Sequence, residues 1–183
     1  MKHTLSMGAV REKPGVPLAV AVAACVISLG VYALWPTRPP PAGKADRVVV
    51  IKSQRTLLLM RGDQVLKSYK VALGRQSVGP KVHEGDHRTP EGNYVLDSRN
   101  PQSRFHLSFH VSYPNASDIT RARGLGETPG GNIMIHGIAN GLGWIGRLHR
   151  LWDWTDGCIA VTNSDIEEIW RAVPDGTRIE IRP

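Results

Sequence analysis

A long apolar segment near the N-terminus dominates the hydrophobic pattern of the chain. No charged residue occurs from Pro14 to Thr37. As a helix, residues 16–35 would be about 30 Å long, which is the thickness of the hydrocarbon core of a bilayer. Arg11 and Lys13 precede the segment, and basic residues favour the cytoplasmic side of a membrane. The pattern therefore predicts a cytoplasmic N-terminus over residues 1–15 and a transmembrane anchor over residues 16–35.

Two other interpretations of this segment stay open. A cleaved signal peptide needs a small-x-small site, and residues 32–36 offer a poor one. A lipoprotein signal is suggested by the residues that lead to Cys25, although the apolar run continues past that cysteine. A buried core helix is disfavoured because four prolines follow closely. These prolines predict an extended spacer over residues 36–45.

Beyond the spacer, short β-branched and apolar runs predict a mainly β domain over residues 46–182. The first three runs are separated by two short turn segments, which is typical of an antiparallel meander. One helix is predicted near the C-terminus, because Ser164 and Glu167 have capping-box spacing and apolar residues from Ile166 to Val173 recur at helical spacing. We expect strands at 47–52, 56–60, 65–73, 93–97, 106–111, 133–135 and 178–181, and a helix that ends at residues 174–176.

Composition and charge narrow the class of protein. Hydrophobic residues make up 41% of the chain and charged residues 21%, which excludes a disordered or collagen-like protein. The net charge is +7, but the basic residues form no block of the kind that nucleic-acid-binding proteins carry. We therefore expect no nucleic-acid partner. A scattered positive charge fits an anionic polymer or a membrane surface, and no feature of the sequence predicts an oligomeric state.

The two cysteines lie in different parts of the chain. Cys25 is in the apolar segment and Cys158 is in the predicted domain, so an intrachain disulfide is not expected. Cys158 follows a glycine-containing turn and precedes the apolar run of residues 159–161. Such a turn can present both a sulfur atom and free backbone N–H groups. A single thiol beyond the membrane is a candidate nucleophile, and a small buried structural residue is the alternative interpretation.

A thiol nucleophile needs a base, and histidine is the usual one. His136 ends the apolar run of residues 133–135 and precedes Gly137, so a strand would carry it to the mouth of a loop. His149 lies nine residues before Cys158, and we expect it only to line the site.

A second group of histidines matches a zinc-protease motif. His83-Glu84-Gly85-Asp86-His87 has the H-E-x-x-H pattern, which binds zinc when a helix places the two histidines one turn apart. Glycine and proline at residues 79–80, Gly85 itself, and a proline at position 90 oppose a helix here. We therefore expect no metal and no other cofactor.

Three motifs in order give a specific resemblance. They are Gly85-Asp86-His87-Arg88-Thr89-Pro90-Glu91-Gly92-Asn93-Tyr94, then Ile133-Met134-Ile135-His136-Gly137, then Thr155-Asp156-Gly157-Cys158-Ile159. Together they resemble the L,D-transpeptidase catalytic domain, known as the YkuD family, over residues 46–182. The resemblance implies a mainly β, sandwich-like fold with a helix near the C-terminus.

The resemblance also implies a catalytic arrangement. Cys158 would be the nucleophile, His136 its base, and Gly137 the source of a backbone carbonyl that orients the imidazole. The N–H groups of Gly157 and Cys158 are the natural oxyanion donors, since they belong to the turn that presents the sulfur. The implied reaction is acyl transfer on peptidoglycan stem peptides: D-alanine leaves a tetrapeptide, and an amine of a neighbouring stem resolves the thioester into a 3–3 cross-link.

The sequence departs from the commonest family pattern at two positions. Asp156 replaces a histidine and Ala160 replaces an arginine. The missing arginine is a fixed cation that could hold a substrate carboxylate, and Arg88, Arg147 or Arg150 could line the cleft in its place. These departures leave the acceptor open. A hydrolase on the same scaffold (an L,D-carboxypeptidase or wall-protein amidase) is the second hypothesis, and a non-catalytic wall-binding module is the third. In each case we expect the domain in the periplasm or extracytoplasmic space.

Overall fold

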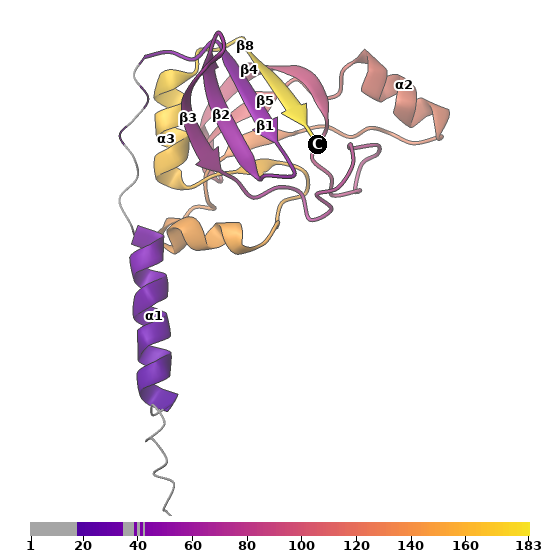
Figure 1. Ribbon diagram of the computed structural model, residues 1–183. Helices are drawn as coiled ribbons and strands as arrows, with labels where there is room; N and C mark the ends of the chain where they lie inside the picture. Colours follow the sequence, from indigo (N-terminus) through magenta and orange to yellow (C-terminus); the bar gives the residue numbers. More distant parts are fainter. Residues whose placement is uncertain (1–17, 35–38, 40, 42) are drawn as a thin grey trace, which may run out of the picture.

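The computed structural model describes residues 18–34, 39, 41 and 43–183 (Figure 1). In the N-terminal part, α1 (Leu18–Leu34) is a helix of 17 residues without a charged side chain, and it projects away from the rest of the molecule. Among the described residues, no helix is long and apolar enough to cross a membrane. The ends of the predicted anchor, Val16, Pro17 and Trp35, lie outside the described residues, as do residues 1–15 and much of the predicted spacer.

A single eight-stranded sheet forms the body of the domain. Its strand order is β3-β2-β1-β8-β4-β5-β6-β7. β1 is parallel to β8 and β6 is parallel to β7, whereas the other neighbours are antiparallel. The bounds are β1 Arg47–Ile51, β2 Thr56–Arg61, β3 Gln64–Lys70, β4 Gly92–Ser103, β5 His106–Val111, β6 Met134–His136, β7 Ile159–Ala160 and β8 Thr177–Arg182.

The sheet curves so strongly that the segment after the edge strand β3 reaches the opposite edge of the sheet at β7. Residues 71–75, which follow β3, run beside β7 and the turn before it: the backbones of Ala72 and Ala160 exchange two hydrogen bonds of 2.9 and 2.8 Å, and Thr155 N donates to Leu73 O at 3.1 Å. The expected mainly β class is confirmed. The expected sandwich is a single half-barrel sheet instead, because the segment after β3 bonds to the opposite end of the same sheet rather than stacking as a second layer.

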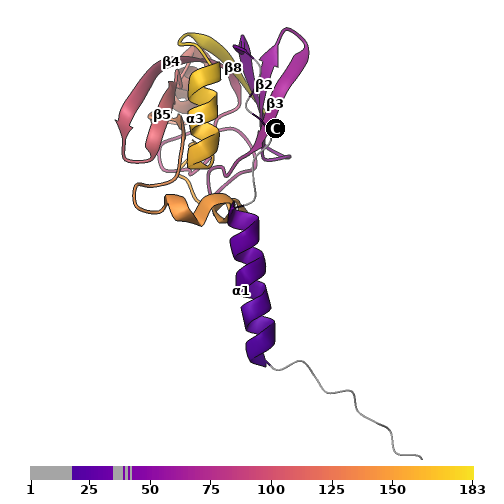
Figure 2. The same ribbon diagram turned by 90° about the vertical axis from the view of Figure 1, so that its left-hand side faces the viewer.

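Three further helical elements lie around the sheet: α2 (Ala116–Gly124), the 3-10 helix η1 (Gly143–Leu151) and α3 (Asn163–Ala172). α3 packs beside β5 (Figure 2), and its fully buried Ile166 and Ile169 complete the hydrophobic core. Arg99 lies over the rings of Phe109 and Trp170, 5.0 and 4.9 Å from their centroids, and so ties β4 to the outer part of this helix.

The predicted helix exists, but its start was wrong by two residues. Thr162, not Ser164, is the N-cap: its hydroxyl accepts from Asp165 N at 3.1 Å, and the Asp165 carboxylate accepts from Thr162 N at 3.4 Å. A similar box formed by Asn115 and Asp118 starts α2, which the sequence analysis did not predict. Most predicted strands agree with the observed ones to within one or two residues. β3, however, ends at Lys70, after which Ala72 pairs with Ala160 of β7, and β4 extends to Ser103.

Candidate functional site

Two short parallel strands bring the predicted nucleophile and base together. In β6 and β7, Ile135 pairs with Ile159 and His136 with Ala160. Ile135 and Ile159 are fully buried in the core. Because side chains alternate along a strand, His136 and Cys158 point to the opposite face, on chains about 4.8 Å apart. Cys158 directly precedes β7, so its sulfur lies two positions along the neighbouring strand from His136.

The turn that presents Cys158 is held by Thr155. Its hydroxyl donates to Cys158 O at 2.7 Å and accepts from Gly157 N at 3.2 Å. Gly157 has a φ of +126°, and a Cβ there would lie 2.6 Å from Arg88 O, so only glycine fits this position. Of the two predicted oxyanion donors, the Gly157 N–H is therefore already engaged in this conformation.

His136 is fixed by its neighbour in the chain. Its Nδ1 lies 2.6 Å from the carbonyl oxygen of Gly137, and since a carbonyl can only accept, Nδ1 carries the proton. Nε2 is then the basic nitrogen. The ring is 3% exposed and packs on Phe105, with ring centroids 4.5 Å apart. The structure thus brings His136 and Gly137 into the relation that the sequence analysis expected.

Burial favours the uncharged forms of both candidate groups. Burial lowers the pKa of His136, and its hydrogen bond to Gly137 only partly opposes this shift. Burial likewise raises the pKa of the Cys158 thiol; the nearby Asp156 acts in the same direction, while the Met134 N–H and Lys81 oppose it. The Cys158 sulfur lies 3.6 Å from the carbonyl oxygen of Asn132. A neutral thiol beside a neutral imidazole suits general-base activation of the sulfur.

A loop ordered by a buried ion pair lies against the cysteine turn. Lys81 is 4% exposed and bonds to Asp86 at 2.8 Å. Burial raises the pKa of Asp86, but Lys81 and the backbone N–H groups of Val82, Arg88 and His83 together outweigh it and keep the pKa below its usual value. One carboxylate therefore fixes the path of residues 81–88. Since Arg88 O closely approaches Gly157, this path decides how the loop packs beside Cys158.

The known proteins that this chain is similar to form one group. The profile of the L,D-transpeptidase catalytic domain (YkuD) matches residues 45–181. The chain belongs to this family. It is 33% identical over 137 residues to YafK of Escherichia coli, a protein named for a proposed L,D-transpeptidase activity, with 72% of this chain and 48% of YafK covered. A Bacillus licheniformis protein, YkuD, named in the same way, is 28% identical over 142 residues, with 75% of this chain and 66% of that protein covered.

Solved structures give the same result for the fold. The helical cell shape determining protein Pgp2 of Campylobacter jejuni, in a mutant form, superposes with a TM-score of 0.59 at 28% identity, over 77% of this chain and 48% of Pgp2. Bd1075 of Bdellovibrio bacteriovorus superposes with a TM-score of 0.51 at 25% identity, over 78% and 51%. The chain thus spans about half the length of YafK, Pgp2 and Bd1075.

The position where this YkuD-family chain has Asp156 carries a charged cluster. Asp156 is 73% exposed and pairs with Arg75, and its Oδ1 lies 2.8 Å from Nδ1 of His87. The hydrogen bond from Arg75 lowers the pKa of Asp156 despite some burial, and His87 adds to the effect. Gly74 packs against this cluster, since a Cβ there would lie 2.2 Å from His87 O. The aspartate therefore holds two cationic or ionisable groups near the thiol.

The three arginines predicted to line the site lie in different surroundings. Arg150 pairs with the buried carboxylate of Asp165, so its charge secures the start of α3. Arg147 is half-buried in η1, and Arg88 is half-buried in the loop beside Gly157. Ala160, at the position of the family arginine, is fully buried and bonded to Ala72 through its backbone. The predicted lining residue His149 is 1% exposed in η1, beside Trp154.

The residues of the zinc-like motif do not form a helix. Residues 83–86 are turns and bends, and His87 lies in irregular backbone. His83 Nδ1 lies 2.8 Å from Glu84 O, whereas His87 faces Asp156, so the two imidazoles have different partners. Within the described residues, no group of three or more His, Cys, Asp or Glu side chains could hold a metal ion.

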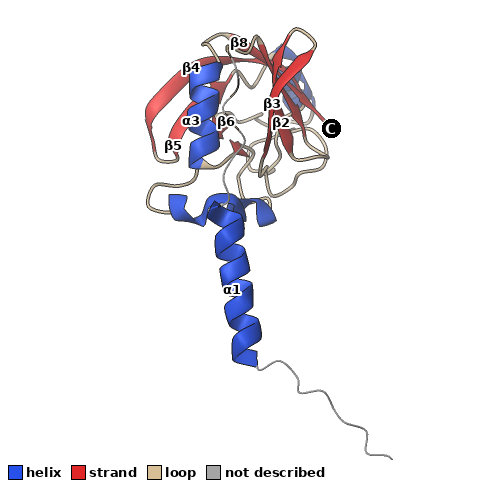
Figure 3. Cartoon of the chain, turned by 60° about the vertical axis from the view of Figure 1, so that its left-hand side comes forward, coloured by secondary structure: helices blue, strands red, loops and turns tan. Residues whose placement is uncertain are grey.

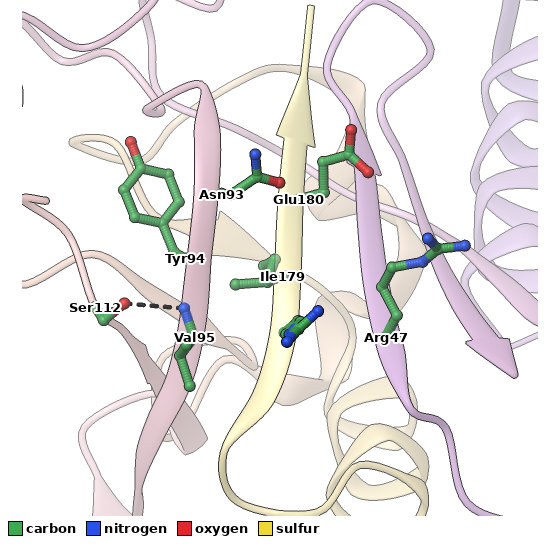
Figure 4. Close-up of a pocket in the computed structure, with 8 residues that line it drawn as sticks. Arg47, Asn93, Tyr94, Val95, Ser112, Ile179 and Glu180 are labelled. Carbon is green, nitrogen blue, oxygen red and sulfur yellow. Dashed lines mark hydrogen bonds between the residues drawn. The ribbon is translucent and has the colours of Figure 1, made fainter. Parts of the chain in front are cut away.

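A pocket of about 450 Å³ lies away from Cys158, on the sheet face formed by β1, β8 and β4 (Figure 4). Its eight lining residues include neither cysteine nor histidine, so the predicted thiol–imidazole pair is not part of it. They are Arg47, Asn93, Tyr94, Val95, Ser112, Arg178, Ile179 and Glu180. The candidate site is therefore the one around Cys158 and His136.

Several residues of the site were missed by the sequence analysis. Phe105 and Trp154 cover His136, Thr155 holds the cysteine turn, and Lys81 with Asp86 orders the adjacent loop. Only Thr155 had a signal, since Ser or Thr in a turn commonly bonds to its own backbone. The others reach the site through contacts between segments far apart in the chain.

Proposed function

We propose that this chain is a cysteine-dependent L,D-transpeptidase that acts on peptidoglycan stem peptides. The observation that carries the proposal is the pairing of β6 with β7, which sets Cys158 on the same face as an imidazole whose tautomer is fixed by Gly137 O at 2.6 Å. Membership of the L,D-transpeptidase family supports the substrate class. The similarity to Pgp2, a cell shape determining protein, supports a role in shaping the wall.

The proposed reaction has two acyl-transfer steps. His136 Nε2 removes the proton of the Cys158 thiol, and the thiolate attacks the amide carbonyl that joins the diamino acid to the terminal D-alanine. The Cys158 N–H stabilises the oxyanion, since the Gly157 N–H is engaged by Thr155. His136 then donates its proton to the departing amine, and D-alanine leaves.

In the second step, an amine of another stem attacks the thioester while His136 Nε2 takes its proton. The C–S bond breaks, His136 returns the proton to the Cys158 thiolate, and the new amide is the 3–3 cross-link.

Product analysis tests this proposal against its alternatives. The full chain in detergent would be incubated with tetrapeptide muropeptides, with Cys158→Ser as the control. Cross-linked dimers and free D-alanine support the transpeptidase. Tripeptide alone would show that water resolves the thioester, as in an L,D-carboxypeptidase. No product from substrate that nevertheless binds the protein would favour a wall-binding module.

We also propose that residues 16–35 attach the domain to a membrane, with the domain in the periplasm or extracytoplasmic space. α1 has no charged residue, and its Val20, Val26 and Ile27 are exposed. The C-terminal end of α1 lies at η1 (Figure 3). Trp144, Leu151 and Trp152, in and just after η1, are exposed there, and tryptophan favours the membrane interface.

Cell fractionation checks this attachment. The full chain should stay with the membranes after a high-salt wash and keep its N-terminus. A mature protein that begins near Pro36, or one that carries lipid on Cys25, would replace the anchor with a signal peptide.

A further inference from the structure

The rings of Phe105 and Trp154 pack on the predicted base, and the histidine beyond Trp154 has a buried nitrogen without an explanation. Trp154 lies edge-on to His136, with centroids 5.8 Å apart, and edge-on to His149 on its other side, with centroids 6.4 Å apart. Phe105 contacts both His136 and Trp154. The indole Nε1 of Trp154 donates to Nδ1 of His149 at 3.5 Å. The indole thus links a buried imidazole in η1 to the imidazole of the site.

His149 is held as a neutral ring with an orphan donor. It is 1% exposed. Burial lowers its pKa to about 3, and Arg150 and His136 add to the shift. Because Nδ1 accepts from Trp154, the proton of the neutral ring lies on Nε2. This nitrogen is buried and has no hydrogen-bond partner among the described residues. The nearest charges on η1 and α3, Arg150 and Asp165, pair with each other.

We propose that His149 is a positioning residue that acts through Trp154: it holds the indole over His136 and so keeps the base dry and oriented toward Cys158. The inference rests on the proposed role of His136 as base. A purely structural role for His149 is the competing account. An apolar side chain of similar size would avoid the orphan donor, so the polar ring is a poor choice for stability alone. A histidine at this position is explained if its Nδ1 is needed to accept the hydrogen bond from the Trp154 indole.

The two accounts predict different results for His149→Leu. If His149 positions Trp154, losing the acceptor lets the indole move and water reach His136. The NMR titration midpoint of the His136 ring should then rise by about half a unit or more toward that of a hydrated imidazole. The thermal midpoint at pH 8 should stay the same or rise, because a buried orphan donor has been removed. A structural role predicts a lower thermal midpoint and an unchanged titration of His136.

Three companion variants sharpen the test. Trp154→Phe keeps a ring but removes the indole N–H, so it should also raise the titration midpoint of His136. The double variant His149→Leu/Trp154→Phe should raise that midpoint little further. His149→Asn places an amide oxygen near the position of Nδ1 and should restore the titration of His136. His110→Leu, which removes a histidine from β5 paired with Asp97, is the control and should leave His136 unchanged.

The readout separates this inference from the proposed function. The titration of His136 needs no substrate, so it reports on His149 even if no muropeptide is converted. Acylation of Cys158 by a carbapenem, followed by mass spectrometry of the Cys158 peptide, gives a kinetic counterpart. In the variants, the acid limb of the pH–rate profile of acylation should move to higher pH together with the titration midpoint of His136. Unchanged His136 titration in both His149→Leu and Trp154→Phe would overturn the inference, whatever the activity of the wild type.

Discussion

The two sides that surround Cys158 hold their polar groups in different ways. On the aromatic side (Phe105, His136, His149 and Trp154), both imidazoles are buried and burial lowers the pKa of each. On the charged side (Arg75, Lys81, Asp86, His87 and Asp156), the carboxylates of Asp156 and Asp86 pair with Arg75 and Lys81, and Asp156 also contacts His87. The aromatic side surrounds the proposed base with apolar rings, whereas the charged side orders a loop and places charges near the Cys158 sulfur.

The largest effect should come from the groups that carry out the chemistry. Cys158→Ala removes the sulfur from a loop, so turnover of muropeptides should fall at least a thousand-fold while the fold is kept. His136→Ala should lower turnover nearly as much. The double variant should be little worse than either single variant, because a nucleophile and its base act as a unit. Initial rates of D-alanine release measure this. Full activity of Cys158→Ala, or its acylation by a carbapenem, would remove Cys158 as the nucleophile.

His149→Ala provides the comparison within the same experiment. His149 does not contact the reacting atoms, so His149→Ala should lower turnover far less than His136→Ala does. If the two variants lose equal activity, the nucleophile stands but the identity of the base must be reconsidered.

On the charged side, the largest effect should be on stability. Lys81→Met leaves the Asp86 carboxylate buried without its cation, and breaking a buried ion pair in this way costs about 3–5 kcal/mol of unfolding free energy. Urea unfolding of the full chain in detergent would measure the loss. Arg182→Met breaks the Arg182–Glu180 pair, whose side chains are 51% and 30% exposed, and as a matched control it should cost far less than Lys81→Met, because exposed ion pairs contribute little to stability. Equal losses would show that the Lys81 pair does not order the loop.

The same comparison shows how far the sequence alone could lead. Cys158, His136 and Gly137 could be proposed from the sequence because they lie at the ends of apolar runs, and the His136–Gly137 contact joins chain neighbours. Phe105 and Trp154 could not, since 31 positions separate Phe105 from His136 and the contact exists only after β5 and β6 pair. β7 has two residues, too few for a periodic signal. The closing of the sheet through residues 71–75 is likewise a long-range event that local pattern does not encode.

A smaller effect on the aromatic side should appear as acid sensitivity. The pKa of His149 is about 3 in the folded protein against an ordinary value of 6.5, so below pH 6.5 the unfolded state binds a proton that the folded state does not. Its contribution to stability is therefore present above pH 6.5 and is lost as the pH falls toward 3. Between pH 7.5 and 5 the loss is about 2 kcal/mol.

The measurement is urea unfolding at pH 5 and pH 7.5 for the wild type and His149→Leu. The leucine variant should lose less stability on acidification, and the remaining slope should reflect His136, whose pKa is also lowered by burial. An identical acid slope in both proteins would mean that His149 is not held neutral.

The smallest effect should be electrostatic and should come from the exposed cluster at Asp156. Asp156 contributes to the raised pKa of Cys158, and its charge is offset by Arg75. Asp156→Asn should lower the pKa of the Cys158 thiol, and Arg75→Gln should raise it. Only the thiolate reacts with iodoacetamide. At a fixed pH below that pKa, alkylation of Cys158 should therefore become roughly two- to five-fold faster in the first variant and slower by a similar factor in the second. The alkylation rate of the double variant should lie between those of the two single variants.

Salt provides the control for this prediction. Since the cluster is solvent-exposed, raising the ionic strength to about 1 M should shrink all three rate differences, because the screening length falls to about 3 Å. Cys25 is followed separately by peptide mass spectrometry. Changes in the same direction for both single variants, or changes that persist in high salt, would assign the effect to the conformation of the turn rather than to the charge of Asp156.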